Sequence, residues 1–173
     1  MLTFLIGYMG CGKSTIGRKL SARLGCDLVD TDHIIEERTG MSISDIFATK
    51  GEEHFRELES ATLAELIAEG KSCIVSTGGG LPLWGDNMEV MNANGCTVYI
   101  RRTAENIASR LSPRGREKRP KLRGLSDEEL VSFMSKNIAE RDAVYCRANH
   151  TIEAVPLRDS EIIDTIIRYQ SDF

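Results

Sequence analysis

A glycine-rich stretch near the start of the chain has the residue types and spacing of a phosphate-binding loop. Residues 7–15 read Gly-Tyr-Met-Gly-Cys-Gly-Lys-Ser-Thr and match the pattern G-x-x-x-x-G-K-[ST] in full. Glycines let backbone amides turn inward and approach an anion closely, while Lys13 can reach phosphate oxygens and the Ser14 hydroxyl can ligate Mg²⁺. The other residues expected to contact the nucleotide here are Gly10, Cys11, Gly12 and Thr15. The stretch therefore predicts a P-loop that holds a nucleotide with Mg²⁺.

The flanking segments are the ones that such a loop needs. An apolar run, Leu2 to Ile6, precedes it and predicts a buried strand, and a helical pattern over about 16–24 follows it. The start of that helix adds the positive end of its dipole to the site. Glycine-rich turns also join strands to helices for purely steric reasons, but the complete pattern between a strand and a helix favours nucleotide binding.

Two acids follow the next apolar segment. Cys26 to Asp32 reads as a strand that ends in Asp30 and Asp32, and residues two apart in an extended chain project to the same side. The third strand ends near Ser76 and offers no acid to position Mg²⁺. We therefore assign Asp30 to the metal and Asp32 to the acceptor hydroxyl, as its orienting group or base. The alternative is that Asp32 only caps the next helix and Asp30 is a surface acid.

An arginine and a glycine triplet are candidates for binding the acceptor of the phosphoryl group. Arg56 has Glu59 one helical turn away, which can hold the guanidinium for a bidentate grip on a carboxylate or phosphate. An ordinary solvent-facing pair explains that spacing equally well. Gly78, Gly79 and Gly80 follow a buried strand and let a small polar molecule approach backbone amides, or they form only a sharp turn.

A basic segment, residues 112–124, lies between two predicted helices. Its run from Ser112 to Arg123 holds six basic residues against one acid. Because the whole protein is acidic and no aromatic residues are interleaved, we expect a mobile lid that closes on phosphate charge rather than a nucleic-acid surface. Arg119 and Arg114 are the candidates to meet the transferring group, and Arg141 on the next helix can converge from the opposite side.

The order of the elements predicts the fold. Strands are expected at 2–6, 26–32, 73–77, 96–100 and 151–152, and helices at about 16–24, 34–39, 52–68, 104–111, 126–144 and 159–169, with an unassigned segment at 42–48. This alternation indicates an α/β fold with a five-stranded parallel sheet, helices on both faces and ligands at the carboxyl ends of the strands. We expect a single domain, 1–173, with a substrate-binding region at about 33–60 and the lid at about 112–124.

Composition narrows the class of protein. The 173 residues are 41% hydrophobic and 28% charged, and a formal net charge of -4 argues against general nucleic-acid or membrane-surface binding. The five cysteines are far apart and never form C-x-x-C, which favours reduced thiols in a cytoplasmic protein. The first strand begins almost at Met1, so we expect no signal segment, and no apolar stretch approaches membrane-spanning length.

Taken together, these motifs resemble the shikimate kinase family, small P-loop kinases related to the nucleoside monophosphate kinases. The resemblance covers nearly the whole chain and rests on residues 7–15, Asp-Thr-Asp at 30–32, Phe-Arg-x-x-Glu at 55–59, Ser-Thr-Gly-Gly-Gly at 76–80, Arg-Pro at 119–120 and Arg-x-x-x-Tyr at 141–145. Two departures are Lys121-Leu122, where the family commonly has two apolar residues, and Ala148, which comes one place early after Tyr145. Neither departure touches a charge needed for chemistry.

The resemblance implies phosphorylation of the shikimate 3-hydroxyl by ATP and Mg²⁺ in aromatic amino-acid biosynthesis. The residues that it assigns to shikimate are Asp32, Arg56, Gly78, Gly79, Gly80 and Arg141, with both arginines on the carboxylate and Phe47 and Phe55 as walls of the pocket. Lys13 and Arg119 would stabilise the phosphoryl group, and adenine would lie near Arg110 and the loop 155–158. We expect a monomer.

Other functions remain open on the sequence. A kinase for another small acid or alcohol, such as gluconate, is compatible with two arginines, whereas a nucleotide acceptor is disfavoured because the lid lacks an acid followed by paired arginines. A nucleotide-dependent regulatory module without turnover is a further alternative. Asp32 and Arg119 argue against it, because a protein that only bound ATP would not need them.

Overall fold

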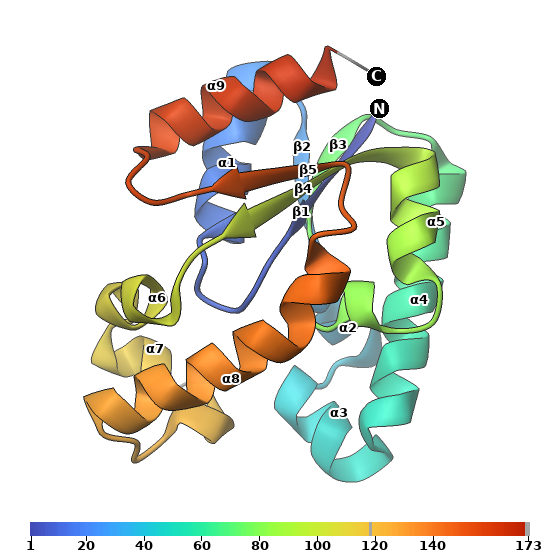
Figure 1. Ribbon diagram of the computed structural model, residues 1–173. Helices are drawn as coiled ribbons and strands as arrows, with labels where there is room; N and C mark the ends of the chain where they lie inside the picture. Colours follow the sequence, from blue (N-terminus) through green and yellow to red (C-terminus); the bar gives the residue numbers. More distant parts are fainter. Residues whose placement is uncertain (118, 172–173) are drawn as a thin grey trace.

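The computed structural model describes residues 1–117 and 119–171, without the side chains of Arg114 and Pro120. Its centre is a parallel sheet in the order β2-β3-β1-β4-β5 (Figure 1). The strands are β1 Leu2–Ile6, β2 Asp27–Asp30, β3 Cys73–Ser76, β4 Gly95–Arg101 and β5 His150–Glu153. The predicted α/β fold with five parallel strands is confirmed.

Helices cover both faces of this sheet, as Figure 1 shows. One face carries α1 and α9, which pack against each other, while α5 packs against β4 on the other face beside α4. The bounds are α1 Lys13–Leu24, α2 Thr31–Thr39, α3 Ile43–Lys50, α4 Glu52–Glu69, α5 Asn87–Asn94, α6 Ala104–Arg110, α7 Pro113–Glu117, α8 Asp127–Tyr145 and α9 Asp159–Gln170, with 3-10 turns η1 Leu81–Leu83 and η2 Pro120–Leu122.

The central strands form the core because their apolar residues are covered on both sides. Every residue of β1 is buried, and β4 is buried from Gly95 to Ile100. Continuous apolar runs of this kind are typical of parallel strands between two helical layers. Each fully buried Leu, Ile or Phe stabilises the fold by roughly 1.5–3 kcal/mol. This rigid centre fixes the strand ends, from which the loops of the site depart.

The junction between β2 and α2 differs from the expected strand over 26–32. The strand ends at Asp30, and Asp32 lies in the first turn of α2. The reason is local: the Asp30 carboxylate accepts a hydrogen bond from the backbone N–H of Asp32 at 3.1 Å and so caps the helix. The argument from alternating side chains in an extended segment is therefore wrong. So is the alternative in which Asp32 is the cap, because Asp30 has that role.

The described residues of the lid segment include short regular elements and are not an irregular loop throughout. They contain the short helix α7 and the turn η2. The hydroxyl of Ser112 accepts a hydrogen bond from the N–H of Gly115 at 3.1 Å, and Leu122 is buried in the main core. A local cap and one apolar anchor therefore hold this basic segment against the rest of the molecule.

The chain between β3 and β4 forms η1 and α5, neither of which the sequence predicted. Helix α5 reads Asn-Met-Glu-Val-Met-Asn-Ala-Asn, and Met88 and Met91 enter the core. Packing therefore stabilises a segment whose asparagines favour turns.

Two further expectations concern the cysteines and the membrane. In the described part of the chain, no disulfide joins any two of the five cysteines. Over residues 1–117 and 119–171, the structure has no helix with the length and apolar character to cross a membrane.

Candidate active site

The P-loop connects β1 to α1 at the carboxyl edge of the sheet. Gly10 and Gly12 have φ of +79° and +107°, a backbone region that other residues rarely adopt, and Gly12 is the N-cap of α1. Lys13 is only 9% exposed, and its Nζ donates to the carbonyl oxygens of Gly7 at 2.7 Å and Tyr8 at 3.2 Å. The loop therefore curls around its own ammonium group at the positive end of a helix.

A cavity of about 450 Å³ opens in front of this loop. It lies where the P-loop, the β2–α2 junction, the end of β3, helix α6 and the lid meet. The predicted site residues that line it are Gly10, Gly12, Lys13, Ser14, Thr15, Asp30, Asp32, Gly78, Gly79, Arg110 and Arg119, together with Met9, Ser76, Thr77 and Leu111. Residues from distant parts of the sequence thus surround one space large enough for a phosphate chain.

Three oxygen-bearing side chains meet beside the first turn of α1. The Ser14 hydroxyl lies 3.4 Å from an oxygen of Asp30 and 3.4 Å from the Ser76 hydroxyl. The sheet sets this arrangement, because Asp30 and Ser76 are directly paired on β2 and β3. Mg²⁺ prefers oxygen ligands and is usually bound through one or two protein groups plus phosphates and water. The donor set fits that ion.

Asp32 has a partly buried carboxyl group that faces the cavity. Burial, followed by the charge of Asp30, raises its pKa to about 6. Its Oδ1 atom is buried and has no hydrogen-bond partner among the described residues. A ligand hydroxyl would supply the missing donor, and a pKa near neutrality suits a group that takes up a proton.

Gly78 lets two acids approach the strand end. A Cβ atom there would lie 2.7 Å from Oδ1 of Asp32 and would also collide with the Glu59 carboxylate. The N–H of Gly78 donates to the Thr31 hydroxyl at 2.9 Å, which ties the glycine triplet to α2. The requirement for glycine at position 78 is therefore steric, and φ is not the cause.

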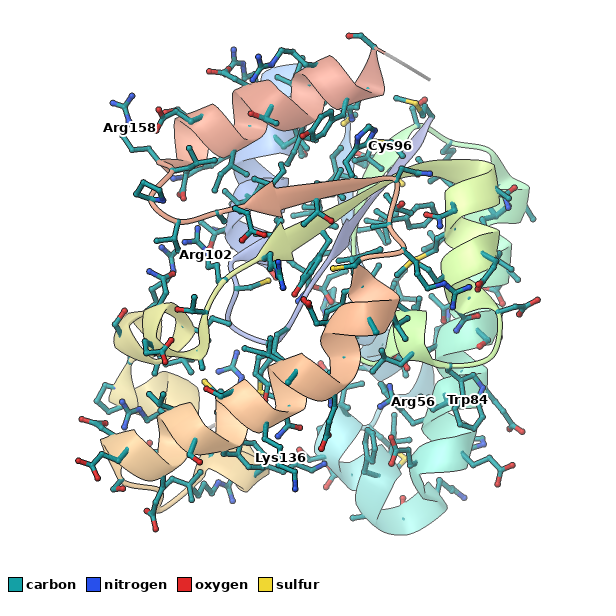
Figure 2. All side chains as sticks on the ribbon, viewed as in Figure 1. Arg56, Trp84, Cys96, Arg102, Lys136 and Arg158 are labelled. Atoms are coloured by element: carbon teal, nitrogen blue, oxygen red, sulfur yellow. The ribbon has the colours of Figure 1, made fainter. Side chains whose placement is uncertain are left out.

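Gly80 has the same role toward Arg56. A Cβ atom at position 80 would overlap the Arg56 guanidinium. That guanidinium donates to Glu59 at 2.5 Å and to Glu52 at 2.9 Å. Arg56 projects from α4 (Figure 2), and Phe47 of α3 lies beneath its guanidinium. The bare backbone of the triplet is thus in direct contact with a fixed cation.

The pairing of Arg56 with Glu59 is buried and is not a solvent-facing pair. Glu59 is fully buried, and this burial raises its pKa to about 7 even though Arg56 favours the charged form. The rings of Phe55 and Phe47 lie 5.3 and 5.8 Å from the guanidinium carbon, beneath the same cation. Arg56 is therefore held from several sides.

Helix α8 brings a second cation to the other side of the triplet. A Cβ atom on Gly79 would lie 3.7 Å from Nη1 of Arg141, whose guanidinium carbon is 5.4 Å from the Tyr8 ring centre. The Tyr145 hydroxyl donates to the Gly79 carbonyl at 2.5 Å. Asp32, Arg56 and Arg141 thus surround the glycine triplet next to the P-loop cavity.

The lid segment contributes a guanidinium group to the cavity. Arg119 lines the cavity and donates to the Gly115 carbonyl at 2.5 Å. The side chain of Arg114, the other lid candidate, lies outside the described residues. Near the expected adenine loop, Arg110 lines the cavity, whereas the Arg158 side chain is 80% exposed and points away from the molecule (Figure 2).

One predicted nucleotide contact has a different placement. Cys11 is buried beneath the loop and does not line the cavity. Conversely, the sequence did not single out Thr31, Tyr8 or Leu111. Thr31 is the middle residue of the Asp-Thr-Asp motif, and its place in that motif could have marked it as a residue of the site. The positions of Tyr8 and Leu111 depend on packing.

Comparison with known proteins points to one family. The shikimate kinase family model matches residues 9–170. A shikimate kinase from Parabacteroides distasonis is 43% identical over 162 residues, covering 93% of this chain and 92% of that protein. The crystal structure of shikimate kinase from Bacteroides thetaiotaomicron has a TM-score of 0.88 and 33% identity, covering 97% of each chain.

A further solved structure is a complex with shikimate. Shikimate kinase from Acinetobacter baumannii, in complex with shikimate, has a TM-score of 0.83 and 32% identity, covering 96% of this chain and 90% of that chain. The family match, the sequence identity and the shared architecture agree over nearly all of the molecule. This chain belongs to the shikimate kinase family.

Proposed function

We propose that this protein transfers the γ-phosphoryl group of ATP to the 3-hydroxyl of shikimate, giving shikimate 3-phosphate and ADP in the synthesis of aromatic amino acids. The observation that carries the proposal is the convergence of Asp32, Arg56 and Arg141 on the glycine triplet beside the P-loop. Family membership and the relative in complex with shikimate support it.

The acceptor is bound by charge and by bare backbone. Arg56 and Arg141 bind the carboxylate of shikimate, because two fixed guanidinium groups suit one planar anion. The backbone of Gly78, Gly79 and Gly80 lets the ring lie close to the strand end, with Phe47 and Phe55 behind Arg56. This arrangement directs a hydroxyl of the ring toward Asp32 and the phosphate cavity.

Transfer proceeds by direct displacement at phosphorus. The 3-hydroxyl oxygen forms a bond to the γ-phosphorus, the bond from that phosphorus to the β–γ bridging oxygen breaks, and the hydroxyl proton passes to Asp32. Lys13 and Arg119 stabilise negative charge on the transferring group and on the leaving ADP. Positioning and charge stabilisation supply most of the catalysis in this reaction class.

The proposal includes Mg²⁺ held through Ser14 and Asp30, whose oxygens already lie together. When bound, the ion neutralises charge on the β- and γ-phosphates. Asp30 also caps α2, so the group that would hold the metal's water shell is itself fixed in place.

At the level of the whole chain, we propose a single domain over 1–173 with a substrate-binding region at 33–60 and a lid at 112–124. We propose that it acts as a cytoplasmic monomer that binds neither nucleic acid nor membranes. Light scattering after gel filtration gives the mass in solution, and a dimer mass would contradict the monomer.

The direct test is incubation with shikimate, ATP and Mg²⁺, followed by mass analysis for one added phosphate and NMR to locate it on the ring. Parallel reactions contain gluconate or a nucleoside monophosphate. Phosphorylated gluconate without shikimate 3-phosphate would replace the proposed substrate. ATP binding without product from any acceptor would favour the regulatory alternative.

A further inference from the structure

Arg102 is a buried cation directly behind the P-loop. It follows the last residue of β4, is 6% exposed, and lies at the edge of the sheet where β4 and β5 end (Figure 2). Its Nε donates to the carbonyl of Cys11 at 2.8 Å, and its Nη1 donates to the Ala154 carbonyl and the Asn106 side chain, each at 3.0 Å. These three acceptors are neutral dipoles, so none of them cancels the charge of the guanidinium.

The bond to Cys11 sets the direction of the next amide. The Cys11 carbonyl and the Gly12 N–H belong to one planar trans peptide and point in opposite directions. Gly12 lines the cavity, whereas Cys11 and Arg102 do not. With the carbonyl held on the Arg102 side, the Gly12 N–H is directed toward the cavity. A charged donor on the carbonyl also polarises the peptide and makes its N–H a stronger donor.

The loop needs such an external constraint at this position. Gly12 has a φ of +107°, and a glycine has several other backbone conformations of similar energy. The charges around Arg102 also favour an anion in the cavity. Burial lowers the pKa of Arg102, and the charge of Arg110, which lines the cavity, lowers it further, while Asp159 opposes both. An anion bound in the cavity would stabilise both arginines.

We propose that Arg102 is a positioning residue for the phosphates of the nucleotide, acting through the Cys11–Gly12 peptide and through its buried positive charge. The same side chain ties the loop to the segment after β5 by its bond to Ala154. The inference rests on the proposed function only in taking an adenine nucleotide as the ligand.

The test compares ADP with AMP, because only ADP carries the second phosphate that a P-loop is built to hold. Calorimetric titration gives both dissociation constants for the wild type, Arg102→Gln and Arg102→Lys. For Arg102→Gln we expect ADP affinity to fall about tenfold, the size of one lost charge-assisted interaction, and AMP affinity to fall about twofold. Arg102→Lys keeps the charge without the fork, so its ADP affinity falls by an intermediate factor.

Arg101→Gln is the matched control. Arg101 is the preceding residue, but it bonds to Asp142 and Glu153 and not to the loop. Its ratio of AMP to ADP dissociation constants is expected to equal that of the wild type. Equal losses for ADP and AMP in the Arg102 variants, or unchanged ADP affinity, would overturn the proposal.

Folding and function are separated within the same experiment. Circular dichroism reports whether Arg102→Gln folds. If this variant does not fold, Arg102→Lys decides the test: a ratio of AMP to ADP dissociation constants equal to that of the wild type overturns the proposal. If the wild type binds ADP but does not phosphorylate shikimate, the proposed function is contradicted. The ratio of AMP to ADP dissociation constants in the Arg102 variants then still tests the inference on Arg102.

Discussion

At the scale of single residues, Asp32 combines burial with an unsatisfied oxygen. Its pKa of about 6 means that the carboxyl is ionised, and able to accept a proton, only above that pH. The rate of transfer is therefore expected to fall as pH drops through about 6. A group with this pKa is a better proton acceptor near neutrality than an ordinary surface aspartate.

We predict that Asp32→Asn lowers kcat about a hundredfold or more, the usual contribution of a general base. Affinity for ATP should stay within about twofold, because the P-loop contacts remain. The acidic limb of the rate profile should also disappear. Steady-state kinetics between pH 5 and 8 test this. The control is Asp164→Asn, because Asp164 is an exposed residue of α9 that pairs with Arg23 of α1. A rate near that of the wild type would refute the role of Asp32.

Arg56 is the residue whose loss should separate acceptor binding from nucleotide binding. We predict that Arg56→Ala weakens shikimate binding by roughly 2–3 kcal/mol through loss of a charge-assisted pair, with ADP affinity unchanged. Arg56→Lys should give an intermediate loss. The control is Arg38→Ala, which removes an exposed pair with Glu65. Unchanged shikimate affinity in a titration of Arg56→Ala would remove Arg56 from the site.

The close contact between Gly80 and Arg56 leads to a steric prediction. In Gly80→Ala the new methyl overlaps the Arg56 guanidinium, which must move, so shikimate binding should weaken by about 1–3 kcal/mol. Gly70→Ala is the control: this C-cap glycine has φ +63° and open space around it. It should cost about 1 kcal/mol of stability and leave the affinity unchanged. Equal affinities of the two variants would contradict the prediction.

At the scale of elements, α8 positions the site by fixing its own rotation. Arg141 and Tyr145 face the glycine triplet, and Asp142 faces the edge of the sheet. Asp142 accepts hydrogen bonds from the Tyr99 hydroxyl at 2.9 Å and from two nitrogens of Arg101 at 3.0 and 2.6 Å. This bidentate contact pins the last turn of α8 to β4, so the orientation of Arg141 depends on a residue that lies outside the site.

We therefore predict that Asp142→Ala costs about 1–2 kcal/mol of stability and weakens shikimate binding through Arg141. The ratio of AMP to ADP affinity should not change. Glu140→Ala removes an exposed acid from the same helix and is the matched control. Urea unfolding and shikimate titration measure the two effects. A loss of stability with full shikimate affinity would show that α8 does not orient Arg141 in this way.

The same scale shows which elements can be predicted from sequence. The P-loop and the glycine triplet were found because their information is local and lies in spacing. The end of β2 was misplaced, because a cap formed by Asp30 competes with extension of the strand and only the hydrogen bond decides. Helix α5 was missed because tertiary packing of Met88 and Met91 overrides weak propensity.

At the scale of the whole molecule, the site depends on contacts that no spacing encodes. Glu59 from α4 and Asp32 from α2 meet at Gly78, and Arg102 after β4 reaches Cys11 in the P-loop. The sequence predicted most of the participants, but their mutual geometry exists only after the sheet has brought the strand ends together. The buried acids in particular could be recognised only once their burial was known.

Those acids make the stability of the whole molecule depend on pH. The pKa of Asp32 is raised from 3.8 to about 6 and that of Glu59 from 4.5 to about 7, chiefly by burial. Between the ordinary pKa of each acid and its raised pKa, the folded protein binds more protons than the unfolded chain. Their stabilising contribution is therefore complete below about pH 4 and is lost as pH rises through 6 to 7. Asp159, whose pKa is lowered by its bond to Lys19, acts oppositely and loses its contribution in strong acid.

We predict that the ligand-free protein is most stable near pH 4 to 5 and loses free energy of unfolding as pH rises to about 7, the upper of the two folded-state pKa values. In Asp32→Asn this loss should be smaller, because the amide removes one ionisation that burial disfavours. The variant should therefore gain stability relative to the wild type as pH rises. Urea unfolding at pH 5, 6, 7 and 8 measures the slope, and Asp164→Asn should keep the slope of the wild type. If Asp32→Asn kept it too, the buried carboxyl would not be the source of the dependence, and its raised pKa could not explain the acidic limb of catalysis.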